Sequence, residues 1–276
     1  MTTRSKSVTP ASVMSAVKGV RASAHRERPL VVAGPPGLVQ ILIADVTRGG
    51  VSAAVREQGP LEGAAALIHI LAGRPSADDE RLLGEAARRR LSIVAVVPSA
   101  ADVHGHLPYV LDENVVRVEG GAGFPLEEIA RRLARALGES ATPLAARLPV
   151  LRPAVCEELI RRFARRNGVI GVVVFVPGAD LPILTLNQIR LVLRIADAYG
   201  FEIDRERIPE VVAVIGSAFG FRAMARKAVG LVPLVGWAVK GGVAYTGTRA
   251  IGEAAVRYFE TRAPVTRIAG ERMRFP

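Results

Sequence analysis

The chain has 276 residues, a formal net charge of +11 at pH 7 and a hydrophobic content of 50%. Aromatic residues make up only 5%, so the core must be built from Ala, Val, Leu and Ile, and a surface that stacks single-stranded nucleic acid is disfavoured. The one cysteine, Cys156, excludes an intrachain disulfide and favours a reducing cytosol. The positive charge would suit nucleic acid, anionic lipid or an acidic protein as partner, although an ordinary solvated surface is the preferred interpretation of the arginine clusters.

Residues 1–28 predict a basic leader without a signal peptide, either mobile or with a short helix over 11–20. Residues 29–140 then alternate between strand-like and helix-like patterns. We expect buried strands at 30–33, 66–72, 91–97 and 115–118, and helices at 38–46, 77–90 and 126–137. Ser76 is placed to cap the second of these helices, whose first turn is acidic. The alternation predicts a shortened, doubly wound, mostly parallel sheet.

The turn Gly34-Pro-Pro-Gly37 lies where a phosphate-binding loop would begin. Such a loop needs backbone N–H groups, a Lys on the phosphates and a hydroxyl on Mg²⁺. This turn has neither side chain, and its two prolines remove two N–H donors. A tight strand-to-helix turn is therefore the preferred interpretation, and Gly34 and Gly37 are kept as candidates for a vestigial nucleotide site.

Three further polar positions in this half have competing interpretations. Asp102 stands where guanine-specific GTPases carry the Asp of Asn/Thr-Lys-x-Asp, but a helix cap is the simpler role, and no Asp-x-x-Gly occurs between the first two strands. His104 and His106 flank a glycine, which predicts a solvent-facing loop rather than a metal site. His69, within an apolar strand, is expected to be a satisfied core histidine.

From Pro143 onward the pattern predicts helices only, so residues 141–262 form a second, all-α domain, followed by a basic tail at 263–276. One helix carries Val155, Leu159, Ile160 and Phe163 on a single face, with Cys156 buried beside them. The spacing Thr185 to Gln188 predicts a capping box, for a helix that runs to Tyr199. A later helix is capped by Asp204, and the last one ends near Phe259.

Small residues and short apolar runs characterise the end of this domain. Gly216 and Gly220 have GxxxG spacing, and a second stripe of small residues follows at Gly241, Gly242, Ala244, Thr248 and Gly252. In lipid such stripes join helices, and in water they form the seam of a tight bundle. No uncharged run reaches the roughly 20 apolar residues of a membrane-spanning helix, although a tilted hairpin over 228–248 is conceivable.

Several short motifs in this half occur together in one order. They are Leu148-Pro-Val-Leu-Arg152, Arg166-Asn167, Pro177-Gly-Ala-Asp180, Leu184-Thr-Leu-Asn-Gln188, Ala198-Tyr-Gly200, Trp237-Ala-Val-Lys240, Ala244-Tyr245 and Tyr258-Phe259-Glu260. With them, about residues 145–262 resemble the GTPase-associated family called domain of unknown function 697. The resemblance implies association with small Ras-like GTPase domains and, in some members, with membranes. It implies no catalytic residue, because the activity of the family is not established.

Seen beside this resemblance, the strand and helix order of residues 30–137 is similar to a degenerate Ras-like GTPase domain, and residues 119–128 resemble the loop that opens the last GTPase helix. The fold class expected is therefore α/β plus all-α. We expect a non-catalytic pseudo-GTPase in the cytoplasm or at the inner face of the cell membrane, with no cofactor or metal. Its partner is a protein, a GTPase among the candidates, or an anionic membrane surface.

The residues expected to contact that partner or lipid lie in the helical domain. They are Arg161, Arg162, Arg165, Arg166, Trp237 and Lys240. One alternative is a cryptic nucleotide hydrolase whose missing cation comes from elsewhere, for example from Arg48. The other is a nucleic-acid binder, which only the net charge favours.

Overall fold

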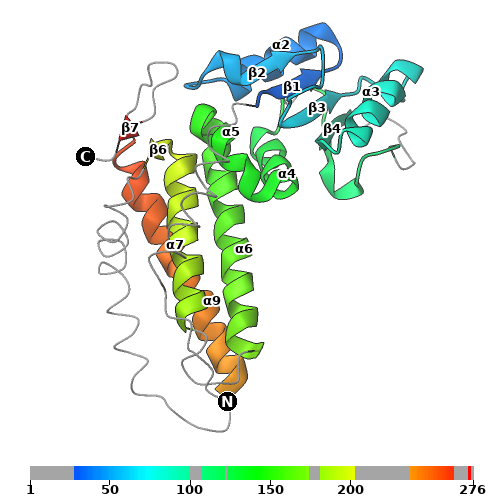
Figure 1. Ribbon diagram of the computed structural model, residues 1–276. Helices are drawn as coiled ribbons and strands as arrows, with labels where there is room; N and C mark the ends of the chain where they lie inside the picture. Colours follow the sequence, from blue (N-terminus) through cyan, green and yellow to red (C-terminus); the bar gives the residue numbers. More distant parts are fainter. Residues whose placement is uncertain are drawn as a thin grey trace. The chain divides into compact units, whose positions relative to one another are not determined.

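The computed structural model describes residues 28–99, 107–121, 123–173, 181–202, 236–263 and 273–274 (Figure 1). These residues fall into two compact units. The first covers residues 28–155, and the second covers residues 156–263 together with 273–274. Each unit is described by itself.

The first unit is built on a five-stranded parallel sheet. Its strands are β1 (Leu30–Ala33), β2 (Val55–Glu57), β3 (Ala66–Ile70), β4 (Ser92–Pro98) and β5 (Val115–Val118), in the order β2-β1-β3-β4-β5. All four strand pairs are parallel. This is the 2-1-3-4-5 order of flavodoxin-like doubly wound sheets, in which the direction of winding reverses between the first and third strands. The expectation of an α/β fold with a parallel sheet is confirmed.

Helices and short 3₁₀ turns connect the strands and follow the last one. They are α2 (Pro36–Val46), η1 (Ser52–Ala54), α3 (Ala77–Arg88), η2 (Asp112–Asn114), α4 (Leu126–Leu137), η3 (Gly138–Ala141), α5 (Thr142–Arg147) and η4 (Pro149–Leu151). The bounds of β1, β5 and α4 agree with the sequence prediction. Gly138 ends α4 with a φ of 58°, a conformation that glycine adopts without strain.

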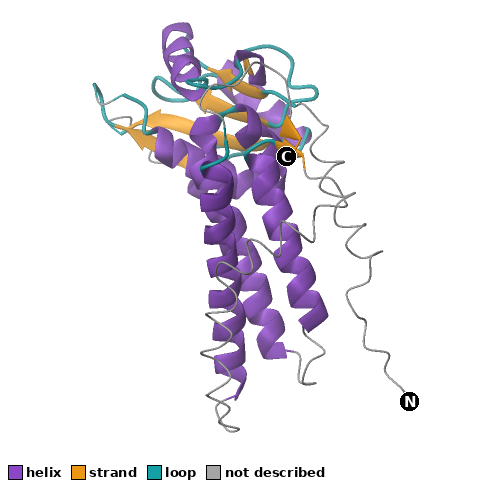
Figure 2. Cartoon of the chain, turned by 90° about the vertical axis from the view of Figure 1, so that its left-hand side faces the viewer, coloured by secondary structure: helices purple, strands orange, loops and turns teal. Residues whose placement is uncertain are grey.

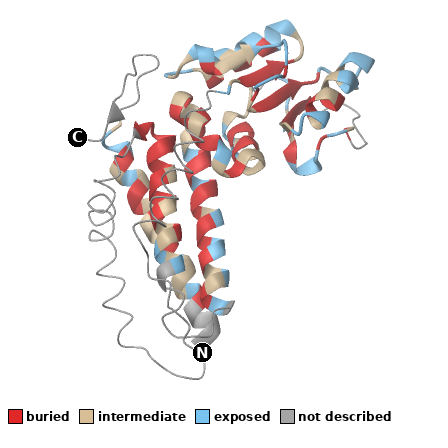
Figure 3. Cartoon of the chain, in the orientation of Figure 1, coloured by how far each residue is buried: buried red, intermediate tan, exposed pale blue. Residues whose placement is uncertain are grey.

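Alternating side chains of the strands enter two apolar layers, and Figure 3 shows that most of the sheet is buried. Val31 and Ala33 of β1 belong to one cluster together with Leu83 and Ala86 of α3. Leu30 and its alternate neighbours along the strand point to the opposite face, where α2 contacts β1 and β2, and α4 contacts β4 and β5. Burial on both faces explains why these strands read as continuous apolar runs.

Two differences from the sequence prediction concern the beginning of the sheet. Strand β2 was missed, because its three residues Val55-Arg-Glu57 offer neither an apolar run nor a clear alternation. Helix α2 starts at Pro36, two residues earlier than predicted, since proline is tolerated in the first turn of a helix. Ser76 is confirmed as the cap of α3, and the structure adds that Asp79 completes a capping box with it.

The second unit holds most of α6 (Arg152–Val173), together with α7 (Leu181–Ala198), α9 (Gly236–Glu260) and two short strands. The three helices run side by side (Figure 2). The apolar face predicted for α6 is confirmed: Leu159, Ile160 and Phe163 are all buried, as is Cys156. The expectation of helices only is wrong, because β6 (Phe201–Glu202) pairs in parallel with β7 (Met273–Arg274). Two-residue strands leave no periodic signal in the sequence.

The small-residue stripe of α9 forms a seam with its neighbours inside the unit. A Cβ on Gly241 would meet Val172 Cγ2 of α6 at 2.5 Å, and one on Gly252 would meet Ile160 Cγ1 of α6 at 2.5 Å. Gly242 is the exception, because it is exposed and has nothing within 4 Å of its Cβ direction. Of the two interpretations of this stripe, the bundle seam holds for Gly241 and Gly252.

The capping box predicted at Thr185 is wrong. Helix α7 already begins at Leu181, so Thr185 lies inside the helix, where its N–H has an intrahelical partner available. The helix stops before Gly200, whose φ of 77° is that of a glycine at a helix end. The predicted cap Asp204 and the GxxxG pair Gly216 and Gly220 lie outside the described residues. Within the described part, no helix is both long and apolar enough to span a membrane.

Candidate functional site

The β1–α2 turn, at the position of a phosphate loop, is too short and too closed to surround a phosphate. Only Gly34 and Pro35 separate the end of β1 from the first residue of α2. The phosphate-loop pattern GxxxxGK[ST] places four residues between its glycines, whereas two separate Gly34 from Gly37. The prolines have no N–H, and beyond Gly37 the N–H groups of residues 38 and 39 both donate to the carbonyl oxygen of Pro35 at 3.0 Å. Few N–H donors therefore remain for a ligand.

Neighbouring strands fix this turn from two sides. Gln58, directly after β2, donates from Nε2 to the carbonyl oxygen of Gly34 at 2.9 Å, and its backbone N–H donates to Val32 at 2.9 Å. A Cβ on Gly34 would lie 2.4 Å from the carbonyl oxygen of Ile70 in β3. Gly34 also has a φ of 139°, so both its close approach and its backbone conformation require glycine.

A cavity of about 380 Å³ opens beside this turn, at the carboxyl ends of β1, β2 and β3. In doubly wound sheets ligands bind in the crevice at this edge, where the winding reverses between the first and third strands. Apolar side chains of the strands and of Leu82 form part of its wall, and the polar lining includes Gln58, His69, Arg74 and Asp78. The cavity is therefore the candidate functional site of the α/β unit.

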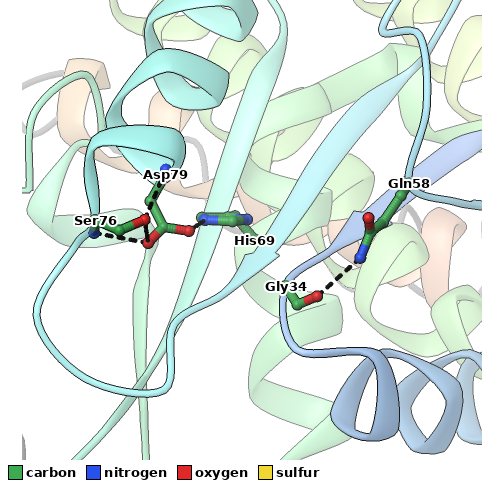
Figure 4. Close-up of polar contacts among 5 residues, drawn as sticks. All are labelled: Gly34, Gln58, His69, Ser76 and Asp79. Atoms are coloured by element: carbon green, nitrogen blue, oxygen red, sulfur yellow. Dashed lines mark hydrogen bonds and ion pairs between the residues drawn. The ribbon is translucent and has the colours of Figure 1, made fainter.

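A buried imidazole and a carboxylate meet at the wall of this cavity (Figure 4). His69 of β3 is only 2% exposed, and its Nε2 lies 2.7 Å from Oδ1 of Asp79 in α3. The other oxygen of Asp79 accepts from the N–H and the hydroxyl of Ser76, at 2.8 and 2.7 Å. The expectation that His69 is fully satisfied is wrong, because its Nδ1 is buried without a hydrogen-bond partner.

The surroundings of Asp79 keep its carboxylate ionised. Burial alone would raise the pKa of Asp79, but the hydrogen bonds from the Ser76 hydroxyl and N–H, and then His69, together lower this pKa below its ordinary value. An ionised carboxylate accepts hydrogen bonds and donates none, so Nε2 of His69 carries the shared proton.

The other candidates for a vestigial nucleotide site do not gather at the cavity. Gly37 is exposed in the first turn of α2 and is not among the lining residues, and Asp102 lies outside the described residues. Arg48 follows the far end of α2, about 16 Å along the 11-residue helix, and pairs with Asp45 at 2.6 Å. Arg48 therefore cannot replace the missing lysine at the turn.

The four arginines predicted to contact a partner lie along one side of α6. Arg161 and Arg162 both pair with the buried Glu158, the second at 2.5 Å. Arg165 and Arg166 are exposed, and the guanidinium carbon of Arg166 lies 5.8 Å from the ring centre of Phe163. The backbones of Trp237 and Lys240 lie in the first turns of α9.

A buried polar chain joins the three helices of the second unit. Asn187 of α7 donates to Oδ1 of Asn167 in α6 at 2.8 Å, and Asn167 donates to the hydroxyl of Thr248 in α9 at 2.8 Å. The Thr248 hydroxyl in turn donates to the carbonyl oxygen of Ala244. All three side chains are less than 5% exposed. Such a chain fixes the register of helices whose remaining contacts are apolar.

The sequence did not identify Gln58, Arg74, Asp78 or the link between Asp79 and His69. The acidic first turn of α3 was visible, but an acidic residue there already has a local role at the helix terminus. The one sequence feature that could have predicted this contact is a histidine in an otherwise apolar strand, since a buried imidazole needs a hydrogen-bond partner. Within the described residues, no group of three or more His, Cys, Asp or Glu side chains is placed to hold a metal ion.

No protein-family model matches the chain, and no curated protein matches it.

Proposed function

We propose that this chain is a non-catalytic, GTPase-related interaction protein. The observation that carries the proposal is the β1–α2 turn, in which two residues link strand and helix, Pro35 and Pro36 have no N–H, and the N–H groups of residues 38 and 39 already donate to Pro35. Binding of β- and γ-phosphates needs several free N–H groups and a cation at this position. The parallel sheet supports a GTPase-like origin only weakly, because many functions share doubly wound folds.

Calorimetric titration of the full chain with GTP, GDP and ATP, each with Mg²⁺, tests this proposal. We expect no heat of binding beyond dilution for any of them, with an active small GTPase run as the positive control. Micromolar binding of any nucleotide contradicts the proposal. Phosphate release in a turnover assay would instead support a cryptic hydrolase.

For the interaction itself, we propose that the exposed side of α6 meets an anionic surface. Arg162, Arg165 and Arg166 lie on this side, and the exposed Val169 and Val172 continue it along the helix, with exposures of 62% and 41%. Basic residues beside apolar ones suit the interface of an anionic membrane, where each cation contributes about 1 kcal/mol. An acidic protein surface offers the same complementarity.

Vesicle co-sedimentation separates these surfaces. We expect binding to vesicles with about 30% phosphatidylglycerol and little binding to neutral vesicles. The double variant Arg165→Glu, Arg166→Glu should lose most of this binding. Arg88→Glu, Arg89→Glu at the C-terminal end of α3 makes the same change in charge and should retain binding, because both control arginines belong to the other unit. Equal loss in both variants would contradict a role specific to α6.

A further inference from the structure

The three helices of the second unit concentrate their charged residues at one end of the bundle. We propose that the other end enters one leaflet of an anionic membrane, with a ring of arginines at the level of the lipid headgroups. This role rests on the proposed anionic partner and makes it more specific. The partner must be lipid, and the contact belongs to one end of all three helices and not to the side of α6 alone.

The buried polar chain of this unit gives a common level in the three helices, because its members are hydrogen-bonded to one another. On one side of this level, a Cβ on Gly252 of α9 would meet Ile160 of α6 at 2.5 Å and Leu191 of α7 at 3.2 Å. On the other side, a Cβ on Gly241 of α9 would meet Val172 of α6 at 2.5 Å. Helix α6 therefore runs toward the end that holds Gly241, and α7 and α9 run away from it.

Beyond the polar level, on the side of Gly241, the three helices carry a single charged residue in their described turns, Lys240. These turns, which we call the apolar end, are 168–173 of α6, 181–186 of α7 and 236–247 of α9. The exposed large apolar side chains described in this unit all lie there: Val169, Val172 and Ile183, with exposures of 62%, 41% and 47%. The exposed Thr246 donates its hydroxyl to the carbonyl oxygen of Gly242 in its own helix at 2.8 Å, so this polar group does not require water.

Cationic side chains surround the polar level on its charged side. Arginines from all three helices lie within one turn of that level: Arg165, Arg166, Arg190 and Arg249. Three of them are exposed and Arg190 is partly exposed. Glu253 pairs with Arg249 at 2.7 Å, which leaves the ring with an excess of positive charge. Cations beside an apolar surface are the arrangement that anionic headgroups attract.

The length of the apolar end fits one leaflet. Helix α6 extends six residues beyond Asn167, to Val173, and α9 begins twelve residues before Thr248, at Gly236. At 1.5 Å per residue these distances are about 9 and 18 Å, and one leaflet contributes about 15 Å of hydrocarbon. A lysine such as Lys240 is tolerated near this depth, because its long side chain can bring the ammonium group back to the headgroups.

Fluorophores on single cysteines test the insertion in the full chain, with Cys156→Ala as background. The label is placed at the exposed positions Val169→Cys or Ile183→Cys, and at Glu157→Cys as the control, which is exposed on α6 at about 15 Å on the charged side of the polar level. On vesicles with about 30% phosphatidylglycerol, lipids with a nitroxide on the acyl chain should quench the first two labels and not the third.

The outcomes of this experiment separate the two proposals. Sedimentation with the vesicles but no quenching at either Val169→Cys or Ile183→Cys overturns insertion and leaves the anionic contact of α6 intact. Absence of sedimentation also overturns insertion, and leaves an acidic protein surface as the partner of α6. Quenching of all three labels overturns the assignment to one end of the bundle.

A second pair of variants tests whether the ring includes α7 and α9. Arg190→Gln with Arg249→Gln removes two charges and none from α6, and the affinity for the same vesicles should fall about tenfold or more. The matched control, Arg257→Gln with Arg262→Gln, removes two exposed charges at the opposite end of α9 and should bind as the parent does. Circular dichroism of each variant should match the parent. Unchanged affinity in the first pair, or an equal fall in both pairs, overturns the proposal.

Discussion

Replacing Gly34 by alanine is the sharpest test of the closed β1–α2 turn. The new Cβ would lie 2.4 Å from the carbonyl oxygen and 2.9 Å from the Cβ of Ile70, and neither atom can rotate away because both are fixed by the backbone of β3. A φ of 139° adds backbone strain of about 1–3 kcal/mol for a residue with a side chain. Overpacking adds about 1–3 kcal/mol. We therefore expect Gly34→Ala to lower the free energy of unfolding by about 3 kcal/mol or more.

Gly37→Ala is the matched control, three residues further along. Gly37 lies in the first turn of α2 with nothing within 4 Å of its Cβ direction, so alanine gains helix propensity without a clash. Its expected effect is a stabilisation of up to about 1 kcal/mol. The two glycines of the supposed phosphate loop should thus respond in opposite directions.

Urea denaturation followed by circular dichroism gives the free energies for this pair. Because the two units need not unfold together, hydrogen exchange of peptides covering β1 and β3 should accompany it and report the α/β unit alone. If the free energy of unfolding of Gly34→Ala stays within about 1 kcal/mol of the parent value, Gly34 does not lie as close to β3 as described. The close approach of Gly34 to β3 would then no longer explain why the turn has no room for a phosphate.

Three further predictions concern packing, hydrogen bonding and pH. Gly252→Ala should lower the free energy of unfolding by about 1–3 kcal/mol, because its new Cβ meets an isoleucine of α6. Gly242→Ala, on the exposed side of α9, should leave stability unchanged or raise it, and thermal melts of both variants test this. Thr248→Val should cost about 1–3 kcal/mol by leaving a buried amide donor of α6 unpaired, and the exposed Thr246→Val should cost under about 0.5 kcal/mol in the same denaturation assay. Because its pKa is lowered on folding, ionised Asp79 stabilises the protein above its ordinary pKa of 3.8, and this contribution disappears as the pH falls through the lower folded value. Urea titrations at several pH values should therefore show a deficit of Asp79→Asn near pH 7 that shrinks below about pH 3.8, and a pH-independent deficit would contradict the assigned ionisation.

The sequence predicted those elements whose residues carry a local signal. Strand β1 is four apolar residues, and α4 lies between a proline and a glycine that ends it with positive φ. Strand β2 was not predicted, because its pairing with β1 makes it a strand and its own composition does not. The Thr185 spacing gave a wrong prediction because α7 begins four residues earlier, at Leu181. A capping pattern predicts a helix start only where no helix has already begun.

The candidate site was harder to predict because it exists only after folding. Gln58, His69 and Asp79 come from three different elements, and their contacts depend on the strand order that brings β1 between β2 and β3. The acidic first turn of α3 predicted only that Asp79 stabilises its own helix terminus, which is correct but leaves out its contact with His69. The second contact, to an imidazole ten residues earlier, requires the register of β3 against α3, which no local pattern encodes.

Two helix termini face the carboxyl-end crevice of the sheet, and neither is suited to a nucleotide phosphate. In a doubly wound sheet, phosphates bind at the crevice because helix N-termini point free N–H groups at it. Here Pro35 and Pro36 at the start of α2 have no N–H, and the N–H groups of residues 38 and 39 donate to Pro35. The first turn of α3 carries three acidic residues, Asp78, Asp79 and Glu80. Neither terminus therefore offers an anion a favourable site.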